Sequence, residues 1–173
     1  MNIRGRSLPV TDLDLRWMRR ALDLAQEAAR AEEVPVGAVI VLGDQVVAEA
    51  RNEVEGRGDP TAHAERLAVQ RAAEAHGYSR LAEAVLYSTL EPCAMCAGAI
   101  LLARARRLVF AARDPKGGCC GSLYDLLGDR RFNHRVEVAE GLLAEESAAL
   151  LRDFFRARRN AAAETRSVRD ART

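Results

Sequence analysis

Apolar residues recur at helical spacing near the start of the chain. Between Leu13 and about Ala31 they fall at Leu15, Met18, Leu22, Ala25 and Ala29. Residues separated by three or four positions share one face of a helix, so this pattern predicts an amphipathic helix. Asp12 or Asp14 is expected to cap its first turn.

The pattern then becomes strand-like. The segments "PVGAVIVL" (35–42) and "QVVAEA" (45–50) are rich in β-branched residues and are separated only by Gly43-Asp44. A two-residue connection of this type predicts a tight antiparallel hairpin. The polar segment 51–61, which contains glycine and proline, is expected to be a loop.

Helices and strands alternate through the rest of the chain. The expected elements are a helix over Ala62–His76 capped by Thr61, a strand at 84–90, a helix at 93–103, a strand at 107–112, a short helix near Tyr124–Leu127, a strand at 134–138 and a helix at 142–160. This order predicts an α/β fold with three layers, α/β/α, around a central mixed sheet of about five strands. We expect one domain over 12–160 and a flexible polar tail over 161–173.

Composition is typical of a folded globular protein. The 173 residues are 49% hydrophobic and 29% charged, with a net charge of +1, which argues against overall disorder. The first residues lack the apolar stretch of a signal peptide, and no apolar run is long enough to span a bilayer. We therefore expect a cytoplasmic protein, in which thiols stay reduced.

Positive charge is carried almost entirely by arginine, since Lys116 is the only lysine. Arginines cluster around 104–107 and again from Arg152 onward. Arginine suits the recognition of phosphate groups. A solvated helix face or a compositional bias would produce the same clusters, so this feature by itself does not decide between a nucleic-acid partner and none.

Two short motifs bring together residue types that bind metals. His63 and Glu65 stand two apart at the start of one predicted helix, and Cys93 and Cys96 stand three apart at the start of the next. A helix N-terminus favours thiolates, which bind metal. Two thiolates and one imidazole give three ligands, so a tetrahedral zinc would keep one position open for water. Glu65 is then close enough to carry a proton between that water and a substrate.

Each motif has a plainer interpretation. A single histidine at a helix start is more often a capping or surface residue, and a single C-x-x-C pair in a cytosolic α/β chain can be a redox pair. The two motifs together, each at the start of a helix, favour a catalytic zinc site.

H-x-E followed by P-C-x-x-C is the signature of the zinc-dependent nucleobase deaminases, and this chain resembles that family. From about Arg16 to Arg159 it is most similar to the bacterial tRNA-specific adenosine deaminases. The similar segments are "EVPVGAVIV" (33–41), "DPTAHAE" (59–65), "TLEPCAMCAGA" (89–99), "RRLVFAARDPKGG" (106–118), "GSLYDLL" (121–127), "NHRVEV" (133–138) and "LLRDFFRARR" (150–159). The "ARDPK", "NHRVEV" and "DFFRARR" segments resemble the tRNA enzymes more narrowly than the zinc motifs do.

The resemblance implies a cytidine deaminase-like fold and a reaction. One Zn²⁺ per subunit would be held by His63, Cys93 and Cys96, with Glu65 as the proton shuttle. The implied reaction is hydrolytic deamination of the wobble adenosine to inosine in a tRNA anticodon stem-loop, by a homodimer. The implied substrate contacts are Asn52, Val36, the Ala64 backbone amide and Leu90 around the base, and Asp114, Lys116, Asn133, Phe155, Arg158 and Arg159 along the anticodon loop.

Some positions depart from the family pattern. Arg51 and Val54 flank the substrate loop where relatives often have an aromatic residue and a proline, and Cys119 and Cys120 replace small apolar residues. Three alternative functions remain: a deaminase of a free base or nucleoside of the guanine or cytosine type, a non-catalytic partner subunit, and a thiol–disulfide oxidoreductase. The presence of Glu65 argues against the non-catalytic subunit.

Overall fold

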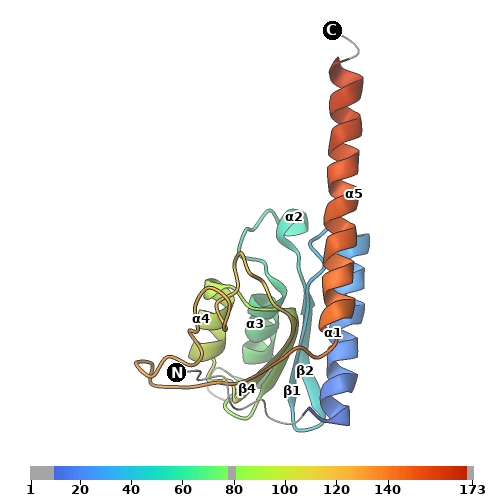
Figure 1. The fold of residues 1–173 in the computed structure, drawn as a ribbon. Helices are drawn as coiled ribbons and strands as arrows, with labels where there is room; N and C mark the ends of the chain where they lie inside the picture. The colour runs from blue at the N-terminus through green and yellow to red at the C-terminus, as the bar shows by residue number, and fades with distance from the viewer. Residues whose placement is uncertain (1–9, 78–80, 171–173) are drawn as a thin grey trace.

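A computed structural model describes residues 10–77 and 81–170 of the chain (Figure 1). The elements in chain order are α1 (Asp12–Arg30), β1 (Gly37–Leu42), β2 (Gln45–Arg51), α2 (Val54–Arg57), α3 (Ala64–His76), β3 (Val85–Leu90), α4 (Ala94–Leu102), β4 (Arg107–Ala112), β5 (Glu137–Glu140) and α5 (Ala144–Asp170). Within these described ranges no helix is both long and apolar enough to pass through a membrane.

The five strands form one mixed sheet in the order β2-β1-β3-β4-β5. β1 pairs antiparallel with β2 and with β3, while β3, β4 and β5 run parallel to one another. Helices α1 and α5 lie on one side of the sheet and α3 and α4 on the other (Figure 1). The predicted three-layer α/β/α fold with a mixed five-stranded sheet is therefore confirmed.

The two faces of the sheet carry separate hydrophobic cores. On β1, Ala38 and Ile40 point toward α3 and α4, whereas Val39 and Val41 point toward α1. This alternation follows from the two-residue period of a strand. Because both faces are covered, β1 is apolar almost throughout, as the sequence pattern indicated.

Helix α1 approaches the sheet very closely at Gly37. A Cβ atom at this position would lie 2.0 Å from the Ala21 carbonyl oxygen, so only glycine fits. The helix begins after Thr11 instead of the predicted Asp12 or Asp14 cap. The Thr11 hydroxyl accepts from the Asp14 amide, and the Asp14 carboxylate accepts from the Thr11 amide, which forms a capping box.

The segment before α3 differs from its prediction. The loop expected over 51–61 contains the four-residue helix α2, which ends at Gly58 in a left-handed conformation. Thr61 does not cap α3, because its amide and hydroxyl both donate to the Asp59 side chain. The helix therefore begins at Ala64, with His63 as its N-cap residue.

Three later boundaries also differ. Residues 124–127 form no helix, because the Gly121 amide donates to the Tyr124 carbonyl and Asp125 pairs with Cys120 in an isolated β-bridge before a turn at 126–128. The last strand lies at Glu137–Glu140 instead of 134–138, because the ring of His134 bonds to the Ala105 carbonyl before the strand begins. Helix α5 continues to Asp170, past the predicted end at 160, through alanine-rich sequence that favours helix. Residues 171–173 of the expected tail lie outside the described residues.

Candidate active site

Two helix N-termini meet beside the carboxyl end of β3. His63 is the N-cap residue of α3 and Cys93 is the N-cap residue of α4. His63 Nδ1 lies 3.6 Å from the Cys93 Sγ and 3.7 Å from the Cys96 Sγ, and the three donor atoms all lie within 4.8 Å of one another. The fold thus brings the two sequence motifs to one point, as predicted.

The spacing of these donors fits a tetrahedral zinc ion. With Zn–S and Zn–N bonds of about 2.3 Å and 2.1 Å, sulfur and nitrogen ligands of one tetrahedral ion lie about 3.6 Å apart. The two nitrogen-to-sulfur distances agree with this value. Two thiols and one imidazole are also ligands that zinc prefers. The three donor atoms could therefore hold one metal ion.

The two cysteines differ in their electrostatics. A hydrogen bond from the Cys96 thiol, supported by one from His63, lowers the pKa of Cys93 to about 3. Cys96 donates to Cys93 and lies 3.6 Å from a Glu65 oxygen, and these contacts together with burial raise the pKa of Cys96. The Cys93 thiolate is thus ready to bind a cation, whereas Cys96 releases its proton when a metal binds.

Glu65 occupies the first turn of α3, and its Oε2 lies 3.6 Å from the Cys96 Sγ. Its side chain is buried, with 4% of the residue exposed. Burial raises the pKa of Glu65, with smaller opposing effects from nearby backbone and from His63. A raised pKa suits a group that takes up and releases a proton near neutral pH.

A cavity of about 330 Å³ opens next to this group. It is lined by Glu33, Val34, Val36, Asn52, Val54, Glu55, Pro60, His63, Glu65, Leu90, Glu91, Cys93 and Asp114. The lining combines apolar walls with a few buried polar groups, as is usual for small-molecule sites. Four of the predicted substrate-binding residues therefore line one cavity with His63 and Cys93: Val36, Asn52, Leu90 and Asp114.

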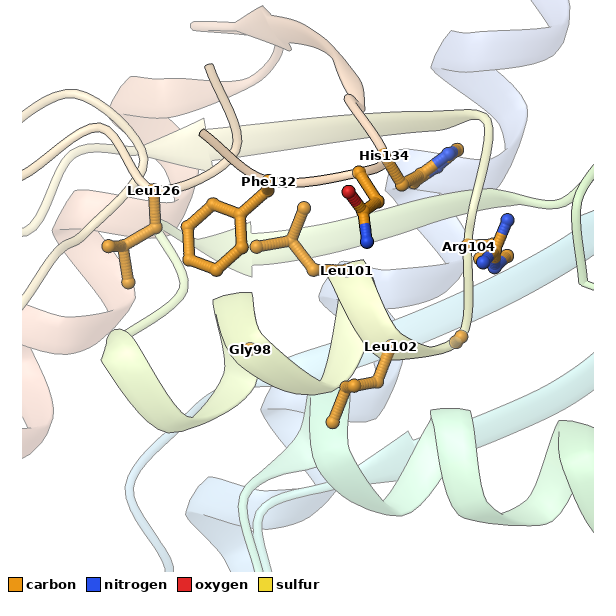
Figure 2. Close-up of a pocket in the computed structure, with 9 residues that line it drawn as sticks. Gly98, Leu101, Leu102, Arg104, Leu126, Phe132 and His134 are labelled. Carbon is orange, nitrogen blue, oxygen red and sulfur yellow. The ribbon is translucent and has the colours of Figure 1, made fainter. Parts of the chain in front are cut away.

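Other predicted contacts lie around this cavity or away from it. Ala64 is the first residue of α3, between His63 and Glu65. Lys116 is exposed two residues beyond Asp114, and its amide donates to the Asp114 carboxylate. Asn133 lines a different cavity, of about 830 Å³. Figure 2 shows this cavity beside α4, with Leu101, Leu102 and Phe132 among its lining residues.

The predicted residues of α5 lie along its exposed length. Phe155 and Arg159 are exposed, and the Arg158 guanidinium lies over the Phe154 ring at 5.7 Å. Arg158 also lines a hollow with Glu55 of α2, a residue that reaches the active-site cavity as well. The hollow beside Arg158 is thus next to the active-site cavity, because Glu55 of α2 lines both.

Two buried carboxylates of the cavity had no predicted role. Glu33 accepts hydrogen bonds from the Asn52 side chain and from the Gly56 amide. Glu91 accepts from the backbone of the loop that follows β4. Their positions in the sequence could have indicated a role, because each acidic residue lies close to a predicted apolar strand. A charged side chain is seldom buried there without a partner.

The fold and this site define a deaminase of the cytidine deaminase-like class. A sequence model of the MafB19-like deaminase family matches residues 13–159. The tRNA-specific adenosine deaminase of Bacillus subtilis is 48% identical over 140 residues, which cover 81% of this chain and 87% of the relative. The tRNA-specific adenosine deaminase of Haemophilus influenzae is 45% identical over 150 residues, which cover 86% of this chain and 87% of the relative.

Solved structures agree with these similarities. A structure from a study of A-to-I editing by tRNA:A34 deaminases aligns with a TM-score of 0.75 at 45% identity, covering 79% of this chain and 99% of that one. A guanine deaminase from Nitrosomonas europaea aligns with a TM-score of 0.72 at 25% identity, covering 88% of each chain. The chain belongs to the family of the tRNA-specific adenosine deaminases.

Proposed function

We propose that this protein deaminates the wobble adenosine of a tRNA anticodon loop to inosine. The observation that carries the proposal is the convergence of His63, Cys93 and Cys96 beside the buried Glu65, next to a cavity of about 330 Å³. The identity to tRNA-specific adenosine deaminases, 48% for the Bacillus subtilis enzyme, supports this substrate.

His63, Cys93 and Cys96 would hold one Zn²⁺ per chain. A bound zinc ion supplies an activated water at neutral pH, because it lowers the pKa of that water to about 7. Glu65 takes a proton from the water through its carboxylate. Glu65 would deliver that proton to N1 of the adenine ring while the water oxygen bonds to C6. It would then carry the remaining proton of that oxygen to the amino group, so the C6–N bond breaks, ammonia leaves and the C6 carbonyl of inosine remains.

The cavity residues orient the base. Val36 and Leu90 would contact the ring, and the Asn52 side chain and the Ala64 amide would hydrogen-bond its polar edge. The presence of Val36, Asn52 and Leu90 in the cavity lining supports this assignment. An anticodon loop offers an unstacked base at low energetic cost, which removes the need to open a duplex.

We propose that residues outside the cavity contact the anticodon loop: Asp114, Lys116, Asn133, Phe155, Arg158 and Arg159. The arginines would neutralise phosphates, and an exposed aromatic ring can stack on a base. We also propose one catalytic domain over 12–160, a cytoplasmic location and a homodimer. Exposed apolar side chains on and near α4, among them Leu102 at 81% exposed and Phe132 at 47%, support a subunit interface there.

Incubation with a transcribed tRNA that carries adenosine at the wobble position tests the function. Reverse transcription and sequencing should read that position as guanosine, and a transcript with guanosine already in place should be unchanged. The similarity to a guanine deaminase gives a second candidate, a free-base deaminase. Ammonia release from guanine or cytosine, with no inosine in the tRNA, would favour that candidate.

A further inference from the structure

Glu91 lies between β3 and the cysteine pair, and its carboxylate binds the loop that follows β4. The residue is 2% exposed. Oε1 accepts from the amides of Cys120 at 3.0 Å and Ser122 at 2.9 Å, and Oε2 accepts from the Asp114 amide at 3.0 Å and from the Ser122 hydroxyl. A carboxylate offers about four acceptor positions, so these four donors fill it.

The loop 113–122 is thereby folded against the strand end that carries Cys93. Gly118 forms a bridge with Cys93, and the Cys119 amide donates to the Pro92 carbonyl at 2.8 Å. A Cβ atom on Gly118 would lie 2.4 Å from the Glu91 carboxyl carbon, so the loop backbone lies directly on the carboxylate. The loop is therefore joined to Cys93 through Gly118 and to Glu91 through the Asp114 amide.

This arrangement bears on the substrate cavity. Glu91, Cys93 and Asp114 all line it. Since the Asp114 amide is bound to Oε2, the position of Asp114 in the cavity wall depends on the Glu91 carboxylate. Glu91 is not one of the three residues grouped as possible metal ligands.

We propose that Glu91 is a positioning residue that sets the Asp114 wall of the cavity and so controls substrate binding. The proposal rests on the proposed function, because it concerns the binding of the anticodon loop. It differs from a purely structural role in one respect: a change at Glu91 should raise KM in a protein that remains folded and loaded with zinc.

Glu91→Gln is the main test variant. Glutamine keeps the size of the side chain but replaces one acceptor oxygen by an NH₂ donor, which then faces protein donors and pushes the loop away. We expect KM for a wobble-adenosine stem-loop to rise about tenfold, the effect typical of residues that orient a site. The value of kcat should change less than KM, and zinc content should stay at the wild-type level.

Ser122→Ala is the milder variant, because it removes only the hydroxyl donor. Its KM should rise about threefold, which is within the net effect of one ordinary hydrogen bond. Glu83→Gln is the matched control, since the Glu83 side chain is 83% exposed, and its KM should equal that of the wild type. Hydrogen exchange should be faster over 113–122 in Glu91→Gln and unchanged over α1.

The outcomes separate the two proposals. A wild-type protein that forms no inosine overturns the proposed function, and with it the catalytic part of this inference. If the wild-type protein is active, two results for Glu91→Gln overturn the positioning role alone. One is a wild-type KM, and the other is a loss of activity that is explained by loss of zinc. If the glutamine variant does not fold, Ser122→Ala decides, and a wild-type KM in that variant overturns the proposal.

Discussion

The side-chain amide of Asn52 donates a hydrogen bond of 3.0 Å to Oε2 of Glu33, and both residues are buried in the wall of the active-site cavity. The other carboxylate oxygen accepts from the Gly56 amide at 2.7 Å. A carboxylate only accepts hydrogen bonds, so the NH₂ group of Asn52 must face Glu33. The orientation of the Asn52 amide in the cavity is therefore fixed.

Glu33→Gln should lower kcat/KM for a wobble-adenosine stem-loop by about tenfold. A glutamine can donate as well as accept, so it no longer selects one orientation of the Asn52 amide. Steady-state kinetics with zinc-loaded protein measure the change. Glu27→Gln, on the partly exposed face of α1, is the control and should retain wild-type kinetics. Equal values for both variants would contradict the orienting role.

Glu65→Ala should retain zinc and lose turnover. Removal of a general acid–base group lowers the rate by about 10²- to 10⁴-fold, whereas His63, Cys93 and Cys96 remain in place to bind metal. Inosine formation under single-turnover conditions and metal analysis of the same sample measure both quantities. Glu74→Gln, exposed further along α3, provides the control. Near-normal turnover in Glu65→Ala would show that another group moves the proton.

Metal removal should abolish activity reversibly. Purified protein should contain about one zinc per chain, and dialysis against a chelator followed by addition of Zn²⁺ should remove and restore inosine formation. Cys93→Ser should lose the metal. Cys119→Ser should keep it, because Cys119 is buried in the loop and is outside the group of three donors. Stoichiometric zinc in Cys93→Ser would contradict the ligand set.

The sequence was sufficient for the elements that depend on local periodicity. The apolar pattern of β1 and the spacing in α1 predicted both elements, because each buries a regular face. The sequence was insufficient where a contact with a residue far away in the chain determines the local structure. The segment Tyr124–Leu127 satisfies its hydrogen bonds across a loop, and the ring of His134 bonds to Ala105, far away in sequence. Neither contact leaves a periodic signal.

The same distinction holds for the site. His63, Glu65, Cys93 and Cys96 were predicted because metal ligands at helix starts have a characteristic spacing, and the structure places them together. Their catalytic roles stay predictions until the experiments above are done. Glu33 and Glu91 were missed because each acts through backbone amides or a side chain from a remote segment. A single sequence does not contain that information.

Gly37→Ala should destabilise the fold severely. The added methyl group would lie 2.0 Å from the Ala21 carbonyl oxygen and 2.8 Å from the Ala25 nitrogen, both backbone atoms that cannot move without shifting α1. We expect the free energy of unfolding to fall by about 3 kcal/mol or more. Urea denaturation measures it. Gly43→Ala is the comparison, since nothing lies within 4 Å of that position, and its left-handed φ of 59° should cost about 1 kcal/mol. Similar losses in the two variants would contradict the packing argument.

The acid limit of stability should depend on Asp14. This buried carboxylate accepts from the Tyr87 hydroxyl at 2.8 Å and from the Thr11 amide at 2.8 Å, and it lies 3.4 Å from an Arg107 nitrogen. Burial raises the pKa of Asp14, but these hydrogen bonds and the Arg107 charge outweigh burial and leave the pKa below its ordinary value of 3.8. The charged form is therefore stabilised by folding, and this stabilisation is present above pH 3.8 and is lost as the pH falls through the folded pKa.

Asp14→Asn should lower the free energy of unfolding by about 3 kcal/mol at pH 6, because it leaves Arg107 without its charge partner. The difference between variant and wild type should shrink as the pH falls below 3.8, where the wild-type carboxylate also becomes neutral. Urea unfolding at pH 6, 4 and 3 measures this difference. The contributions of other acid-sensitive groups are the same in both proteins and cancel. Asp12→Asn, exposed in the same turn, should show little of the effect. A difference that is constant from pH 6 to pH 3 would mean that Asp14 contributes through shape and not through charge.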